Sequence, residues 1–175
     1  MVTIYYQKLV YTKKMVNIIE LLTDEKKISK INELEKDRYI NFLENSYKDN
    51  LGHCEFSIDK FPRWSIISGY YSMHDITKLF LVKKFNIKID FEVHSTTIKV
   101  LKSIINDREI IDLIEEGYNR FKSLASDLNE AKKERVKVQY YTNTPFMKEE
   151  YKKKAKLFLD ETVLIYLDKV KELLK

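Results

Sequence analysis

The sequence predicts an all-α protein, an antiparallel up-and-down bundle of four to five helices with an N-terminal extension. Only 3 glycines and 2 prolines occur among 175 residues, so the chain has few of the residues that build tight hairpins or phosphate-binding loops. Apolar residues recur at helical spacing along most of the chain. The stretch that follows Pro62 is apolar on nearly every side, which is typical of a helix at the centre of a bundle.

Length and composition indicate one domain and restrict the kind of site it can carry. The chain has the size of a single domain with a sizeable core. Its 32 basic and 27 acidic residues give a formal charge of +5, which permits nucleic-acid binding without requiring it. The single cysteine, Cys54, excludes an internal disulfide and a cysteine-cluster metal site. His53 beside it has no further soft ligand nearby in the sequence, so we expect no metal and no cofactor.

The same composition predicts a cytoplasmic protein that has no membrane contact. A lone cysteine suits a reducing compartment. No run of about 18 uncharged apolar residues occurs, and the N-terminus lacks the basic start and apolar centre of a signal peptide.

The sequence divides the chain into an N-terminal extension, residues 1–25, and a helical-bundle domain, residues 26–175. The extension contains a weak helical pattern, and its opening MVTIYY is equally compatible with a strand. A helix is predicted from Asp24, as N-cap, to about Gly52. Residues 50–61 would then form the main loop. The apolar positions behind this prediction are Ile28, Ile31, Leu34, Phe42 and Leu43.

Residues 85–93 give conflicting signals. Their apolar residues alternate strictly with polar ones, the pattern of a half-buried strand. One strand is not a sheet, however. Unless MVTIYY or VKVQYY pairs with this segment, the favoured interpretation is an extended connection whose apolar side packs on the bundle.

Helical spacing resumes at His94, and two further helices follow. Asp107 is expected to begin a long helix that runs to about Gln139. Asn143, Thr144 and Pro145 then interrupt the pattern. The last helix carries its apolar residues on one side, at Tyr151, Ala155, Phe158, Leu159, Thr162, Tyr166, Val170 and Leu173.

The order of these features resembles the HEPN domain, a nucleotide-binding helical bundle. Its central helix has a pattern like Tyr-Tyr-Ala-Met-Phe-His, and Tyr70, Tyr71, Ser72, Met73, His74 and Asp75 stand in that place. Its next helix opens with a Ser-His pair, where this chain has Val93, His94 and Ser95. A later Arg, spacer and Asp-Tyr correspond to Arg135, Tyr140 and Tyr141 without the Asp. The final pattern, an Ala with Phe-Leu soon after, matches Ala155, Phe158 and Leu159.

The resemblance implies a bundle that is often a homodimer and often works beside a small nucleotidyltransferase partner protein. Catalytic members are metal-independent ribonucleases in which a His follows the Arg by four to six residues. Here residues 136–141 contain no His. Cleavage by the 2′-hydroxyl needs a base and an acid with pKa values near neutrality, and tyrosine, with a pKa of about 10, is a poor substitute. The sequence therefore favours a protein without catalysis.

The predicted ligand-binding residues are centred on Arg135. The cations of Lys132, Lys133, Arg135 and Lys137 would meet phosphates, and the Tyr140 ring would meet a base. The plain alternative is a solvated helix end whose cations complement the helix dipole. Two further candidates, Tyr70 and His74, are more often core residues than ligands. A second basic run, on the last helix, comprises Lys148, Lys152, Lys153, Lys154 and Lys156.

Three functions stay open from the sequence. The leading hypothesis is a HEPN-like protein without catalysis that binds nucleotide, RNA phosphate or a partner protein through the Arg135 region. The second is a ribonuclease toxin of a toxin–antitoxin pair that uses Arg135 with Tyr140, Tyr141 or His94. The third is a structural or antitoxin-type interaction protein with an exposed apolar face. Salt separates them, because phosphate binding weakens steeply as salt rises and apolar association does not.

Overall fold

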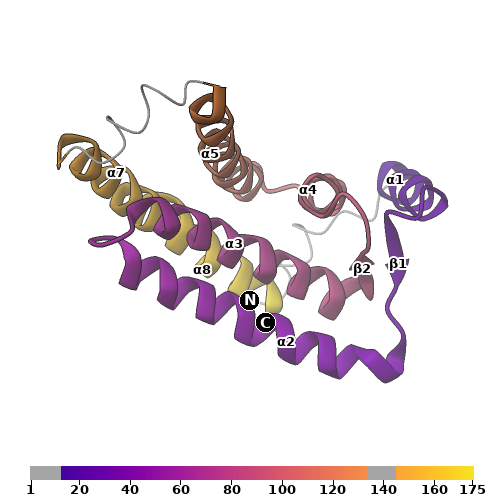
Figure 1. The fold of residues 1–175 in the computed structure, drawn as a ribbon. Coiled ribbons are helices and arrows are strands. Elements are labelled where there is room, and N and C mark those ends of the chain that lie inside the picture. The colour runs from indigo at the N-terminus through magenta and orange to yellow at the C-terminus, as the bar shows by residue number, and fades with distance from the viewer. Residues whose placement is uncertain (1–12, 134–144) are drawn as a thin grey trace.

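The computed structural model describes the backbone of residues 13–133 and 145–175, and the side chains of residues 15–124 and 148–175. These residues are mostly helical, which confirms the all-α class in its coarse form (Figure 1). The elements are α1 (Lys13–Asp24), β1 (Ile28–Lys30), α2 (Glu33–Ser57), α3 (Pro62–Phe85), β2 (Ile87–Ile89), α4 (Val93–Ile104), α5 (Arg108–Lys133), α7 (Pro145–Phe158), a π-helical turn η2 (Leu159–Val163) and α8 (Leu164–Leu174).

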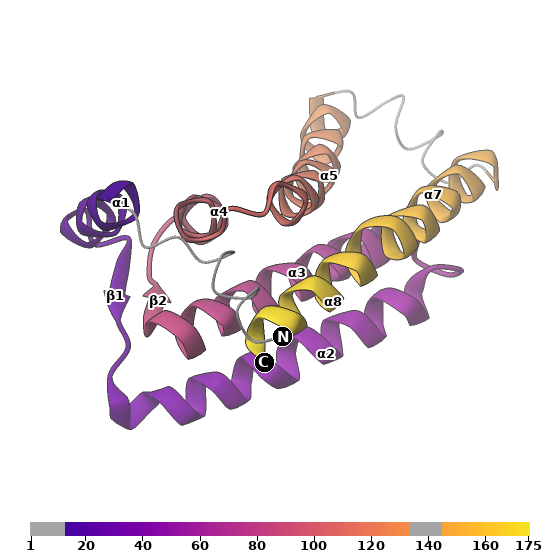
Figure 2. The ribbon, with the colours of Figure 1, turned by 180° about the vertical axis from the view of Figure 1, so that it is seen from behind.

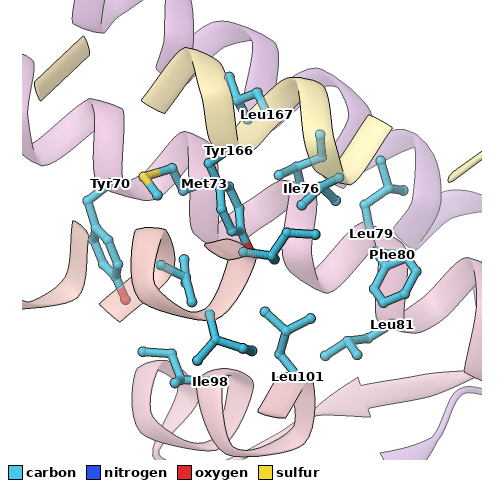
Figure 3. Packing of buried hydrophobic residues seen from close by; sticks show 14 of the residues in the cluster. Tyr70, Met73, Ile76, Leu79, Phe80, Leu81, Ile98, Leu101, Tyr166 and Leu167 are labelled. Carbon is cyan, nitrogen blue, oxygen red and sulfur yellow. The ribbon is translucent and has the colours of Figure 1, made fainter. Parts of the chain in front are cut away.

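Helix α3 is the centre of the fold, as its apolar character predicted. Pro62 is its first residue, where the missing N–H costs nothing. The helix packs against α2, α4, α5, α7 and α8 and is buried along most of its length. Figure 3 shows part of this core: Ile76 and Leu79 of α3 lie between Leu167 of α8 and Leu101 of α4. Burial of apolar area on all sides is the main stabilising contribution of such a helix.

Different helices and strands form the two ends of the molecule (Figures 1 and 2). Helices α1 and α4 and the strand pair lie at one end, and the α2–α3 turn and the start of α7 lie at the other. Met15 and Leu22 of α1 are buried and belong to the core, and α1 packs against α4. The segment MVTIYY lies outside the described residues.

The helix predicted from Asp24 to Gly52 is wrong at both ends. Asp24 ends α1 instead of capping a new helix, and Lys26 then adopts a left-handed φ of 56°. Helix α2 begins after Asn32, whose Oδ1 accepts a hydrogen bond from the Leu34 N–H at 3.0 Å. It continues through Gly52 to Ser57, because packing against α3 along its length outweighs the cost of about 1 kcal/mol for a helical glycine. The predicted loop 50–61 therefore shrinks to residues 58–61.

The favoured interpretation of residues 85–93 as an extended connection is also wrong. Ile87–Ile89 forms a strand that pairs antiparallel with Ile28–Lys30, so that Ile28 lies opposite Ile89. The two partners considered from the sequence, MVTIYY and VKVQYY, lie outside the described residues. The pairing works because Ile28, Ile87 and Ile89 are all buried on the core side. The sequence pattern assigned Ile28 to a helix and did not predict this strand. Three residues are too few to show the alternation of apolar and polar residues that marks a strand.

The later helices begin where the sequence predicts. Asp107 caps α5, since its Oδ1 accepts hydrogen bonds from the N–H groups of Glu109 at 3.1 Å and Ile110 at 3.3 Å. The described part of α5 ends at Lys133, and its predicted continuation to Gln139 lies outside the described residues. Helix α7 begins at Pro145. The π turn η2 then inserts a wider turn before α8, at the point where Val163 faces α3.

Two glycines in helices should respond to alanine with opposite signs. A Cβ at Gly69 would lie 3.0 Å from Val163 Cγ2, 3.1 Å from Cys54 Sγ and 3.2 Å from Phe158 Cε1, whereas one at Gly52 would meet no atom within 4 Å. We expect Gly69→Ala to destabilise the protein by about 1 to 3 kcal/mol through overpacking. We expect Gly52→Ala to stabilise it by up to about 1 kcal/mol. Urea unfolding of both variants measures the difference, and equal shifts would contradict the close approach of α3 to η2.

Candidate functional site

Three predicted site residues meet between α3 and α4. Tyr70 Oη lies 2.8 Å from His94 Nδ1, and the rings of His74 and His94 lie 4.8 Å apart, centroid to centroid. Tyr70 and His74 share one face of α3 because they are four residues apart, and His94 projects from the first turn of α4. We call this group, with the rings that surround it, the imidazole–tyrosine cluster: Tyr70, Tyr71, His74, His94, Tyr118 and Phe121.

The sequence gives no sign that α5 contributes to this cluster. Tyr118 stacks on His94 with ring centroids 6.0 Å apart, and Phe121 stacks on Tyr70 at 4.9 Å. Both residues were predicted only as apolar positions of a core-facing helix. Their spacing shows that they share a face, but it does not show which histidine that face meets.

The proton positions in the Tyr70–His94 pair follow from burial. The Tyr70 side chain is fully buried, and burial raises the pKa of its hydroxyl far above the usual value. The hydroxyl therefore keeps its proton, and a buried donor needs an acceptor. His94 Nδ1 is the acceptor within reach. His94 thus carries its own proton on Nε2, so that its free nitrogen is a donor.

His74 is the buried member of the histidine pair. Thr97 Oγ1 donates to the Val93 carbonyl at 2.6 Å, so it accepts from His74 Nε2 at 3.2 Å. His74 Nδ1 lies 3.7 Å from Asp75 Oδ1 and makes no hydrogen bond to any described residue. Burial lowers the pKa of this imidazole, and the neighbouring Lys78 ammonium lowers it further, whereas Asp75 opposes the shift. His74 is therefore a neutral core group at physiological pH.

Asp75 is a structural anchor between α2 and α3. Its Oδ2 accepts hydrogen bonds from Ser46 at 2.6 Å and Asn50 at 3.1 Å, and its Oδ1 pairs with Lys78 at 2.7 Å. Burial alone would raise the pKa of this carboxyl, but interactions with His74, Lys78 and Ser46 outweigh it and lower the pKa to about 2. A carboxylate held this firmly stays ionised and does not exchange protons near neutral pH.

His94 is suited to recognition and poorly suited to acid–base catalysis. Its ring is half-buried. Burial, together with electrostatic interactions with the His74 ring and the Lys78 ammonium, lowers the pKa of His94 to about 4, against the opposing effect of Asp75. The nitrogen that would accept a proton is already bonded to Tyr70. At neutral pH the cluster therefore offers an N–H donor and aromatic surface.

The predicted ligand-binding residues fall into two groups that are apart in space. Lys132 and Lys133 lie at the end of α5, and Lys132 is about 16 Å further along the helix axis than Phe121. Their side chains lie outside the described residues, as do Arg135, Lys137, Tyr140 and Tyr141. The pairing of Arg135 with His94 in the ribonuclease hypothesis stays a prediction.

The second basic run lies beside the α2–α3 turn. Lys152 Nζ lies 2.6 Å from Asp59 Oδ1. The pKa of Asp59 is lowered first by this hydrogen bond to Lys152 and further by the charges of Lys148 and Lys156. Lys152 of α7 thus pairs with Asp59, and the charges of Lys148 and Lys156 act on the same carboxylate. Trp64, which was predicted to lie on a mostly buried helix, is instead 57% exposed at this end of the molecule.

Three other kinds of site were considered among the described residues: a surface hollow, a metal centre and a membrane-spanning helix. A shallow hollow of about 530 Å³ follows one side of α5 and is lined by Asp112, Glu115, Glu116, Asn119, Arg120 and Ser123, a largely acidic set that would repel phosphate. In the part of the chain that the structure describes, no three His, Cys, Asp or Glu side chains gather as they would around a metal ion. Nor does any described helix have the length and apolar character needed to span a membrane.

Comparison of this chain with protein-family models, curated proteins and solved structures finds no match.

Proposed function

We propose that this chain is a HEPN-like up-and-down helical bundle that binds nucleotide or RNA phosphate through the Arg135 region without catalysis. The observation that carries the proposal is the placement of basic residues on both sides of segment 134–144. Lys132 and Lys133 end α5, and exposed Lys148 and Lys153 lie in the first turns of α7. Cations at both ends of the segment that contains Arg135 would favour a phosphate ligand there.

The absence of catalysis is supported by the chemistry of the histidines. His94 is neutral near pH 7, and its acceptor nitrogen is bonded to Tyr70. His74 is buried and cannot reach a ligand. No histidine follows Arg135 at the spacing of the ribonuclease motif. The two histidines of the imidazole–tyrosine cluster therefore lack a free base of suitable pKa, which supports a binding role over RNA cleavage.

A partner protein is the second candidate ligand. Leu34 and Phe42 of α2 are 93% and 60% exposed, and they lie on the side of α2 that faces away from α3. Exposed apolar side chains on one helix face are typical of protein interfaces. We propose that this face contacts a second copy of the chain, or a small nucleotidyltransferase partner, in the cytoplasm.

Arg135→Ala is expected to weaken RNA binding about tenfold, the effect of one charge-assisted contact of about 1.5 kcal/mol. The measurement is fluorescence anisotropy of labelled single-stranded RNA at about 50 and 200 mM salt. Four phosphate contacts predict a loss of affinity of about 50-fold over this range in the wild type. Arg108→Ala is the matched control, because Arg108 is exposed at the opposite end of α5.

Two outcomes would contradict the proposal. Salt-insensitive self-association without RNA binding would favour the interaction protein. Cleavage of end-labelled RNA on a denaturing gel without added metal, lost in Arg135→Ala, would make the chain a ribonuclease.

A further inference from the structure

Three large aromatic side chains are exposed around the α2–α3 turn. Phe56 is 71% exposed, and Phe61 and Trp64 are each 57% exposed. Between them, Pro62 is buried, and the Ser65 N–H bonds to the Phe61 carbonyl at 3.1 Å, so the backbone of this turn is well held. Single exposed apolar residues are ordinary, but three around one short turn indicate a binding surface. We call these three residues the aromatic tip.

A row of cations on α7 passes the α2–α3 turn, where Lys152 pairs with Asp59. Lys148, Lys152 and Lys156 recur every four residues, so they lie along one side of the helix at intervals of about 6 Å. All three act on Asp59 in the turn itself. Lys60 follows Asp59 and is exposed, and Glu149 is a second carboxylate that acts on Lys152, so four lysines face two carboxylates over this region. The surface therefore carries an excess of positive charge beside its aromatic rings.

We infer that the aromatic tip and this lysine row form a binding surface for single-stranded RNA. The inference rests on the proposed function and names its ligand more narrowly. Lysines in a row follow the phosphates of one strand, and exposed rings stack on bases that are not already paired. A duplex keeps its bases stacked inside, where Phe61 and Trp64 cannot reach them.

The linear arrangement of the cations favours a strand over a membrane surface. A membrane attracts basic groups spread over the face that it meets, with aromatic residues inserted at the interface. Here the cations form a single row along α7, with Lys152 beside the turn and Lys148 and Lys156 about one helical turn to either side. We therefore treat lipid binding as the competing outcome of the test.

Trp64 is the only tryptophan in the chain, so its fluorescence reports on the tip without a label. We expect a short oligouridine to quench Trp64 emission, because a stacked base provides a route for energy loss. We expect the quenching to have the same midpoint as the anisotropy change. A double-stranded RNA of the same length should leave the emission nearly unchanged.

Matched variants test the two parts of the surface. Lys148→Gln/Lys156→Gln should reduce the logarithmic salt slope of RNA binding by about 1.4, the value for two contacts to a single strand. Lys84→Gln/Lys99→Gln removes the same charge from exposed positions on α3 and α4 and should leave the slope unchanged. Phe61→Ala should weaken binding about fivefold or more, the effect of one stacked base. Phe91→Ala, which removes a ring that is 62% exposed just before α4, is its control.

The outcomes separate this inference from the proposed function. If RNA binds and depends on Arg135, but Trp64 emission and both tip variants are unchanged, the inference is overturned and the proposed function stands. If no RNA binds, both are overturned. A blue shift of Trp64 with phosphatidylserine vesicles, without quenching by RNA, would overturn the inference in favour of a membrane surface.

Discussion

Phe158→Ala is expected to lower the free energy of unfolding by about 3 to 5 kcal/mol, a large part of the 5 to 15 kcal/mol that stabilises a typical domain. The Phe158 ring is fully buried at the junction of α7 and η2. It lies against Gly69 of α3, and the Arg120 guanidinium lies 5.4 Å from its centroid. Truncation would leave a cavity where α3, α5 and α7 meet, and the tightly packed helices could close it only in part.

Urea unfolding followed by circular dichroism measures this effect. Phe56→Ala is the matched control, because that ring is mostly exposed on α2 and its loss should change stability by no more than about 0.5 kcal/mol. A Phe158→Ala variant as stable as Phe56→Ala would show that α7 is not packed on α3 as described.

Acid is expected to destabilise the protein in two steps, and the first belongs to His94. Its folded pKa of about 4 lies below the usual 6.5, so the unfolded chain binds the proton first. The stability that the neutral ring contributes is complete above pH 6.5 and is lost as the pH falls toward 4. With allowance for solvent screening of a half-buried ring, the loss is about 2 kcal/mol. The buried His74, whose pKa is also lowered, acts in the same direction.

The second step belongs to Asp75. Its pKa falls from 3.8 in the unfolded chain to about 2 in the folded protein, so its contribution is complete above pH 3.8 and is lost toward pH 2. The difference corresponds to about 2 kcal/mol.

Urea unfolding at a series of pH values separates the two steps. His94→Gln should flatten the dependence between pH 6.5 and 4 and leave the lower step in place. Asp75→Asn should remove the lower step. NMR titration of the His94 ring gives a direct reading of the first step, and a folded-state pKa near 6.5 would contradict the burial and charge environment of the cluster.

The sequence was most reliable where local chemistry decides the structure. Pro62 in the first turn of α3 and Asp107 at the start of α5 were predicted from single residues, and the predicted interruption at Pro145 coincides with the start of α7. The burial of α3 followed from apolar residues on all its sides. These features need no knowledge of distant parts of the chain.

The predictions were wrong where contacts with residues far along the chain determine the local structure. The strand at Ile28 exists because Ile89, far along the chain, lies opposite it. Helix α2 passes Gly52 because α3 lies alongside. Trp64 is exposed although Pro62, Ser65 and Ile66 beside it are buried, since its side of α3 is not covered by another described element. Periodicity describes which residues share a face, and it contains no information about what that face meets.

The candidate site shows the same division. The sequence by itself determined that the chain is mostly helical, that Tyr70 and His74 share a face of α3, and that a basic run lies in the first turns of α7. Only the tertiary structure decided that His94 bonds to Tyr70 and lies beside the His74 ring, and that Lys152 of α7 pairs with Asp59 in the turn that carries Phe61. The physical reason is the distance along the chain over which each interaction acts. Helix propensity and capping depend on residues a few positions apart, whereas ring contacts, ion pairs and pKa shifts depend on groups that packing brings together.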